Sequence, residues 1–332
     1  MYTNQSKSVN HLFFMQLALT QARKHLGKTK ENPSVGCVIA KKNSLIGVGV
    51  TSLGGRPHGE QNAITFSKTV LKNSNIYVTL EPCSHYGKTP PCTKKIINKK
   101  FKKVFFSFND PDIRSFNRSK FIFNRADITV KKGILSRELN NFYRSYFKSK
   151  KGFLPFVSCK LAISRDFYTI SKKNKWITNY FSRARGHLIR SQHDCIMTSG
   201  KTIISDNSKL TCRIDGLKNI SPSRIILDNK LKISLKSNII QDAEKFRTII
   251  FYNKFNKEKI NKLKNLKVEL YEVSLDERNN LDLFQVLQKA KKLGFYRILL
   301  ESGLTLVNSF FYKKLIDDFY LFVSDKNLGL NG

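Results

Sequence analysis

Apolar residues recur at helix and strand spacings through the first half of the chain. Leu12, Met15, Leu19 and Ala22 lie three or four residues apart, which predicts a helix over 11–26. Beyond it, the pattern predicts strands at 35–40, 45–50, 76–80 and 104–108, and helices at 60–68, 93–98 and 136–147. Because strands alternate with helices, we expect a layered α/β domain over residues 1–147.

The alternation restarts after the polar stretch 148–152, which ends in glycine and is typical of a linker. Helices are predicted at 179–191, 283–293 and 305–314. Strands are predicted at 156–162, 195–198, 224–227, 248–252, 267–270, 297–300 and 318–323. This pattern predicts a second α/β domain over residues 152–332.

Composition narrows the choice of partners. The 332 residues carry a net charge of +36, which suits either a phosphate-rich partner or a lysine-rich composition with no specific partner. The lysines are scattered along the chain, so we favour the second explanation and expect no nucleic-acid partner. The six cysteines do not predict a disulfide framework in a chain of this length. Without an apolar signal core or a run of eighteen apolar residues, we expect a soluble, cytoplasmic protein with no membrane partner.

Three short motifs in the first half contain residue types that bind zinc. His58 precedes a predicted helix, Cys83 follows a predicted strand and is expected to open the next helix, and Cys92 follows two prolines. One histidine and two cysteines give zinc three protein ligands and leave a fourth position for water. Zinc lowers the pKa of such a water from about 15.7 toward about 7. Glu60 is placed to take the water's proton and return it to a leaving amine, as in zinc deaminases.

Each of these residues also has an ordinary explanation when taken alone. A single histidine is more often a surface or core residue, and the cysteine pair has eight residues between its members, more than structural zinc sites favour. Their order, each beside a turn signal and a strand end, favours a catalytic zinc, because a structural site would need a fourth ligand.

At these residues the sequence resembles the bifunctional riboflavin-biosynthesis deaminase/reductase family. The first half carries NPSVG at 32–36, HGE at 58–60 and the long motif TLEPCSHYGKTPPC at 79–92. The second half carries KLAISRD at 160–166, WIT at 176–178, ILD at 226–228 and ESGLTL at 301–306. The resemblance covers nearly the whole chain and is more specific in the first half.

The resemblance implies a cytidine-deaminase-like α/β/α layered domain followed by a dihydrofolate-reductase-like α/β domain that uses NADPH. It implies that a diaminopyrimidinone with a ribosylamino 5-phosphate is first deaminated, and that its ribosyl side chain is then reduced to ribityl. It also implies a homo-oligomer. His58, Cys83 and Cys92 would hold zinc, and Glu60 would be the catalytic proton donor.

The remaining site residues also follow from the resemblance. Asn32, His85 and Lys88 would face the deaminase substrate. Residues expected to border NADPH are Ala162, Trp176, Thr202, Asp206, Asn229, Gly303, Leu304, Thr305, Leu306, Val307, Asn308 and Ser309. Residues expected to border the reductase substrate are Asn174, Arg190, Leu210, Arg213 and Glu301.

The sequence departs from the family at four places. Gly59 stands where the family usually has alanine, and we expect activity to survive this change. The segment after Pro111 lacks the family's Gly-rich turn, and Phe167 stands where the family has a glycine that a turn with positive φ would need. The chain also stops at Gly332, where the family continues; a missing strand would expose a sheet edge.

These departures leave two alternatives to the bifunctional enzyme. The second half would be a non-catalytic module if Phe167 and the early end disable it. Alternatively, the first half would be a nucleic-acid deaminase that uses the basic surface, which predicts salt-sensitive RNA binding.

Overall fold

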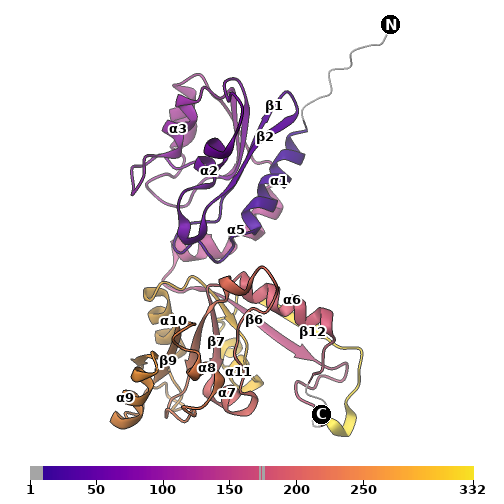
Figure 1. Cartoon of the computed structure of the whole chain (residues 1–332), viewed down its shortest axis with the longest axis vertical. Helices are drawn as coiled ribbons and strands as arrows, with labels where there is room; N and C mark the ends of the chain where they lie inside the picture. Colours follow the sequence, from indigo (N-terminus) through magenta and orange to yellow (C-terminus); the bar gives the residue numbers. More distant parts are fainter. Residues whose placement is uncertain (1–9, 172, 174–175) are drawn as a thin grey trace. The chain divides into compact units, whose positions relative to one another are not determined.

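The computed structural model describes residues 10–171, 173 and 176–332 (Figure 1). The chain divides into two units, with the boundary between Lys151 and Gly152. Each unit has its own sheet and its own hydrophobic core. The predicted linker at 148–152 is instead largely helical, because the helix that ends the first unit continues to Lys151.

The first unit is built on a five-stranded sheet with the order β2-β1-β3-β4-β5. β1 pairs antiparallel with both β2 and β3, whereas the β3–β4 and β4–β5 pairs are parallel. The strands are β1 (Gly36–Lys41), β2 (Ser44–Val50), β3 (Asn75–Leu80), β4 (Lys103–Phe108) and β5 (Thr129–Lys132). The helices are α1 (His11–Arg23), α2 (Gly59–Phe66), α3 (Cys92–Asn98), α4 (Ser119–Asn124) and α5 (Ser136–Lys151), and a short 3₁₀ turn lies at η1 (Leu53–Gly55).

Helices cover both faces of this sheet at close range. A Cβ on Gly36 of β1 would lie 1.8 Å from Ala18 O of α1, and a Cβ on Gly49 of β2 would lie 2.3 Å from Ala63 N of α2. Gly49 is paired with Cys37, the neighbour of Gly36, so the two glycines face opposite sides of the sheet. Helices α1 and α2 therefore form the outer layers of an α/β/α arrangement, as predicted.

The second unit is built on a seven-stranded, all-parallel sheet with the order β10-β9-β8-β7-β11-β6-β12. The strands are β6 (Phe156–Ile163), β7 (Cys195–Ser199), β8 (Ser223–Leu227), β9 (Thr248–Tyr252), β10 (Glu269–Glu272), β11 (Arg297–Leu300) and β12 (Asp318–Val323). The helices are α6 (Tyr180–Ser191), α7 (Gly200–Asp206), α8 (Asn238–Gln241), α9 (Lys257–Asn265), α10 (Leu283–Lys292) and α11 (Leu304–Tyr312), with 3₁₀ turns η2 (Lys218–Ile220) and η3 (Gly329–Asn331).

Both faces of the central strands are buried, as is usual for a parallel sheet. Along β8, Ile225 and Leu227 belong to one apolar cluster and Ile226 to another. Strand β12 lies at the edge and pairs with β6 on one side. Its residues Phe319 and Leu321 are exposed.

Hydrophobic periodicity missed the short elements and misplaced some boundaries. Helices α4, α7, α8 and α9 and strand β5 were not predicted; they are short or strongly polar. Strand β10 begins at Glu269 rather than at 267, because Lys267 has a positive φ of 63° that a strand does not allow. Phe167 keeps the left-handed conformation expected of the family's glycine, with a φ of 67°.

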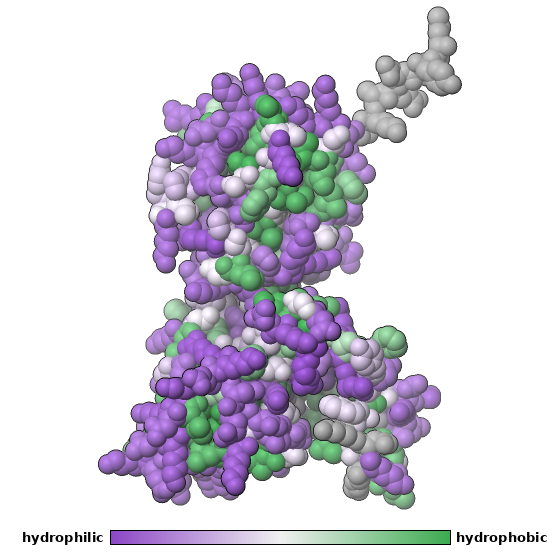
Figure 2. Space-filling model, in the orientation of Figure 1, coloured by the Kyte–Doolittle hydropathy of each residue, from purple (hydrophilic) through white to green (hydrophobic). Residues whose placement is uncertain are grey.

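Figure 2 shows a largely hydrophilic face, in keeping with the many charged residues. An apolar area lies on the first unit around α1 and β2, where Leu12, Phe13, Leu45 and Val48 are exposed. In the described part of the chain, no helix is both long and apolar enough to cross a membrane.

Candidate active sites

The three predicted zinc ligands converge from separate segments of the first unit. His58 is the N-cap of α2, Cys83 lies in the loop after β3, and Cys92 is the first residue of α3. Their ligand atoms all lie within 4.8 Å of one another, with His58 Nδ1 3.6 Å from Cys83 Sγ and 3.5 Å from Cys92 Sγ. Zinc bonds of about 2.05 Å to nitrogen and about 2.3 Å to sulfur, at tetrahedral angles, separate two such atoms by about 3.6 Å. The donor set therefore fits zinc in both chemistry and spacing.

The prediction that Cys83 opens a helix was wrong, since α3 begins nine residues later at Cys92. Cys83 is nevertheless held at the start of that helix, because the backbone N–H of Cys92 donates to Cys83 Sγ at 3.3 Å. A hydrogen bond from the Cys92 thiol lowers the pKa of Cys83, burial opposes this shift, and His58 adds to the lowering. The site therefore favours a thiolate at Cys83, the form that binds a metal.

Glu60 is buried beside this triad, with 3% of its surface exposed. Burial raises its pKa to about 7; the nearby Cys83 also raises it, while His58 opposes the shift. A carboxyl group with a pKa near neutrality accepts and returns a proton readily at physiological pH. The structure thus places beside the three ligands a group suited to proton transfer.

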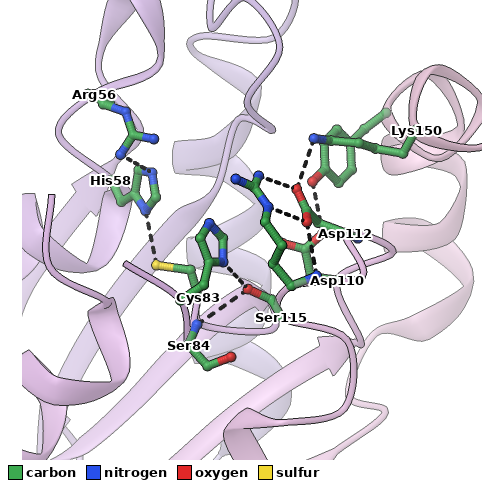
Figure 3. Close-up of polar contacts among 11 residues, drawn as sticks. Arg56, His58, Cys83, Ser84, Asp110, Asp112, Ser115 and Lys150 are labelled. Atoms are coloured by element: carbon green, nitrogen blue, oxygen red, sulfur yellow. Dashed lines mark hydrogen bonds and ion pairs between the residues drawn. The ribbon is translucent and has the colours of Figure 1, made fainter. Parts of the chain in front are cut away.

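The predicted substrate residues of the first half lie in two loops. His85 and Lys88 are in the loop between β3 and α3, where His85 Nδ1 pairs with Ser115 Oγ at 2.8 Å (Figure 3). Asn32 lies between α1 and β1, and its amide donates to Gly55 O at 3.3 Å.

The segment that lacks a Gly-rich turn is organised by Glu81, to which the sequence assigned no role. Its buried carboxylate accepts hydrogen bonds from the backbone N–H groups of Asp110, Asn117 and Ser119, at 3.0 to 3.1 Å. Asn117 supplies the positive φ of 57° that a glycine would otherwise provide. Ser115, from the same segment, accepts from the backbone N–H of Ser84 at 3.3 Å and so braces the loop next to Cys83. Only the fold brings these loops together.

The second unit contains a cavity of about 2120 Å³. The predicted cofactor and substrate residues that line it are Ala162, Trp176, Arg190, Thr202, Asp206, Leu210, Arg213, Asn229, Glu301, Gly303, Leu304, Thr305, Leu306, Asn308 and Ser309. Val307 does not line it, because this position on α11 faces the core, where Val307 is 4% exposed. Asn174 lies outside the described residues.

One end of the predicted substrate region carries a buried ion pair. Arg190 donates to both oxygens of Glu301, at 2.7 and 2.9 Å, and also to Thr211 O at 3.0 Å. Burial alone would raise the pKa of Glu301, but the Arg190 guanidinium outweighs it and holds that pKa below its ordinary value. Burial, together with Arg190 and Arg213, lowers the pKa of nearby His187 to about 4.

A cluster of hydroxyl groups lies where β7 and β11 end. Thr202 Oγ1 is 2.9 Å from Ser199 Oγ and 3.1 Å from Ser302 Oγ. Gly303 is the N-cap of α11, and a Cβ added to it would meet no atom within 4 Å. Open space at a helix N-terminus suits an anionic group such as a cofactor phosphate.

The sequence of each unit matches a known family model. Residues 8–108 match the cytidine and deoxycytidylate deaminase zinc-binding region, and residues 155–332 match the RibD C-terminal domain. The riboflavin biosynthesis protein RibD of Actinobacillus pleuropneumoniae is 32% identical, over 98% of this chain and 87% of the relative.

The chain belongs to the RibD family.

Other RibD proteins show the same extent of similarity. The relative from Aquifex aeolicus is 32% identical over 95% of this chain and 87% of its own. The RibD structure from Acinetobacter baumannii superposes with a TM-score of 0.82 at 30% identity, covering 97% of this chain and 88% of that one. The deaminase/reductase from Thermotoga maritima superposes with a TM-score of 0.83 at 29% identity, covering 96% and 87%.

Membership confirms the leading prediction for both halves. The chain is a bifunctional deaminase and reductase of riboflavin biosynthesis, with a zinc-binding deaminase domain and an NADPH-dependent reductase domain. The bifunctional enzyme is therefore favoured over the two alternatives, a non-catalytic second half and a nucleic-acid deaminase.

Proposed function

We propose that His58, Cys83 and Cys92 hold the zinc of the deaminase reaction and that Glu60 is its proton carrier. The substrate is the diaminohydroxyphosphoribosylaminopyrimidine named for the Thermotoga maritima relative. The observation that supports this most directly is the spacing of His58 Nδ1 from the two thiols, 3.6 and 3.5 Å, with buried Glu60 two residues further on.

Zinc in this site would act as a Lewis acid that activates water for attack on the ring. Glu60 would take a proton from the attacking water and deliver it to the amino nitrogen as its bond to the ring carbon breaks. The net change is hydrolysis, with a carbon–oxygen bond formed and ammonia released. A pKa of about 7 lets Glu60 perform both transfers near neutral pH.

Neighbouring loops would hold the substrate in place. His85 is oriented by Ser115, which is itself fixed by the segment that Glu81 organises. Lys88 is exposed in the same loop and offers a positive charge. Asn32 would complete the site from the loop before β1.

In the second unit, NADPH would supply the hydride that reduces the ribosyl side chain. The hydroxyl groups of Thr202 and Ser302 and the open N-terminus of α11 at Gly303 would bind cofactor phosphate. Arg213 would attract the substrate phosphate, because it lines the cavity and makes no ion pair in the described part of the chain. Arg190 and Glu301 neutralise each other and would orient the sugar.

Ammonia release and NADPH oxidation, followed separately on zinc-loaded protein, test these assignments. Glu60→Gln should slow ammonia release by roughly 10²–10⁴-fold and leave the reduction of already deaminated substrate unchanged. Arg213→Gln is the matched variant for the other unit and should raise the KM for reduction without affecting ammonia release. Absence of ammonia from folded, zinc-loaded wild-type protein would refute the assignment.

We also propose that the protein acts in the cytoplasm as a homo-oligomer, with small molecules and not nucleic acid as its partners. The exposed apolar area around α1 and β2 suits an interface between copies. Sedimentation measures the oligomeric state directly. RNA affinity with a steep dependence on salt would contradict the absence of a nucleic-acid partner.

A further inference from the structure

Arg56 lies beside the deaminase site, and neither the sequence motifs nor the assignments above use it. It directly follows the 3₁₀ turn η1, two residues before His58, and it is half-buried. Its Nη1 lies 3.4 Å from His58 Nε2 (Figure 3). The same Nη1 donates to Thr89 Oγ1 at 3.1 Å. The guanidinium thus connects a zinc ligand to the loop that carries His85 and Lys88.

Two nearby cations, Arg114 and Lys150, share the carboxylate of Asp112. Asp112 accepts from Arg114 at 2.6 and 2.8 Å and from Lys150 at 3.1 Å, as Figure 3 shows. Within the described ranges, neither Arg56 nor Lys88 has a carboxylate within salt-bridge distance. These two side chains are therefore available to an anionic group of a ligand.

The side chains of Arg56 and His85 both approach the open position where Gly87 lacks a Cβ. A Cβ placed on Gly87 would lie 3.5 Å from Arg56 Nη2 and 3.9 Å from His85 Nε2. Two nitrogen-bearing side chains converging on one point, next to Lys88 in the same loop, is an arrangement that suits a tetrahedral oxyanion.

Zinc binding would also free part of the Arg56 guanidinium. A neutral imidazole that binds a metal through Nδ1 carries its proton on Nε2, where it cannot accept a hydrogen bond. Thr89 accepts from only one of the five N–H groups of the Arg56 guanidinium. The remaining N–H groups can then donate to another acceptor.

We propose that Arg56 binds the 5-phosphate of the deaminase substrate, together with Lys88 and His85. This inference rests on the proposed function of the first unit. The ribosylamino phosphate is the part of the substrate that does not react, so its binding energy positions the ring at the zinc ligands. Arg56 acts as a determinant of specificity for the phosphorylated substrate.

The test compares ammonia release from the substrate and from its dephosphorylated form, for wild type, Arg56→Gln and Arg56→Lys. Because ammonia comes only from the first reaction, phosphate binding in the second unit does not enter the measurement. A charged hydrogen bond corresponds to roughly ten- to hundredfold in affinity. Arg56→Gln should raise the KM for the phosphorylated substrate by about that factor, with little change in kcat, while Arg56→Lys recovers part of the loss.

Two controls, the zinc content of each variant and a second charge removal, distinguish phosphate binding by Arg56 from an indirect effect on His58 and from a general effect of charge. Lys99→Gln removes one exposed charge after α3 and should leave the preference for phosphate unchanged. Equal losses on both substrates, or loss of zinc from Arg56→Gln, would show that Arg56 acts through His58 and would overturn the proposal. An unchanged phosphate preference in Arg56→Gln would also overturn it. Failure of wild type to release ammonia would instead contradict the proposed function.

Discussion

Gly59 separates His58 from Glu60, and the structure predicts that alanine at this position destabilises the first unit. A Cβ on Gly59 would lie 2.3 Å from Val35 O and 3.3 Å from Thr51 N. An ordinary carbon–oxygen contact is longer by about 1 Å, so the backbone has to move by that amount. Thr51 N donates to Val35 O at 2.9 Å, and Val35 N donates to Thr51 Oγ1 at 2.9 Å, so the obstacle is fixed in place.

Gly59→Ala should lower the free energy of unfolding of the first unit by about 1–3 kcal/mol, as overpacked cores do. A shift of about 1 Å also misplaces His58 and Glu60, and such a displacement can reduce the rate of ammonia release by about 100-fold. Family resemblance alone suggested that either residue is tolerated here. The close approach of α2 to Val35 makes glycine the residue that fits.

Thermal unfolding of the zinc-loaded full chain, followed by zinc release to a chromogenic chelator, reports on the first unit. Gly186→Ala is the matched control, because a Cβ on Gly186 in the middle of α6 would meet no atom within 4 Å. Gly186 belongs to the second unit, so this variant should leave the temperature of zinc release unchanged. The second unit itself should gain about 0.5–1 kcal/mol of stability, through the higher helix propensity of alanine. Zinc release from Gly59→Ala at or above the wild-type temperature would refute the packing argument.

Three further predictions concern pH, a turn and the metal. The pKa of His187 is lowered to about 4, so the folded state binds fewer protons than the unfolded state below pH 6.5, and stability should fall from pH 7 to pH 5. Allowing for partial solvent screening, His187→Gln should remove about 1 kcal/mol of that fall in urea unfolding. Phe167→Gly should stabilise the second unit by up to about 1 kcal/mol in the same assay, because exposed Phe167 has a φ of 67°; a destabilised variant would show that the ring packs. Chelation of zinc should lower the unfolding temperature of the first unit while NADPH affinity stays constant, and a parallel loss of NADPH binding would contradict separate sites.

The sequence by itself determined the two α/β units and predicted which residue types converge in the first one. The strands with strong apolar runs, such as 248–252 and 297–300, were predicted to the residue, because burial on both faces leaves a continuous apolar signal. The convergence of His58, Cys83 and Cys92 was predictable, because residue type and order along the chain are typical of a three-ligand zinc site. Short polar elements such as α9 carry no such signal.

Only the tertiary structure decided which residues that are far apart in the sequence come into contact. Glu81 and Ser115 look unremarkable in sequence, yet Glu81 organises the segment that contains Ser115, and Ser115 braces the loop of His85. Val307, which was expected to border NADPH, does not line the cavity, because its position on α11 faces the core. Likewise, the restriction at Gly59 depends on a carbonyl oxygen 24 residues earlier in the chain, at Val35. Hydrophobic pattern and motif spacing report on local structure, whereas contacts at this separation exist only once the sheet and helices have packed.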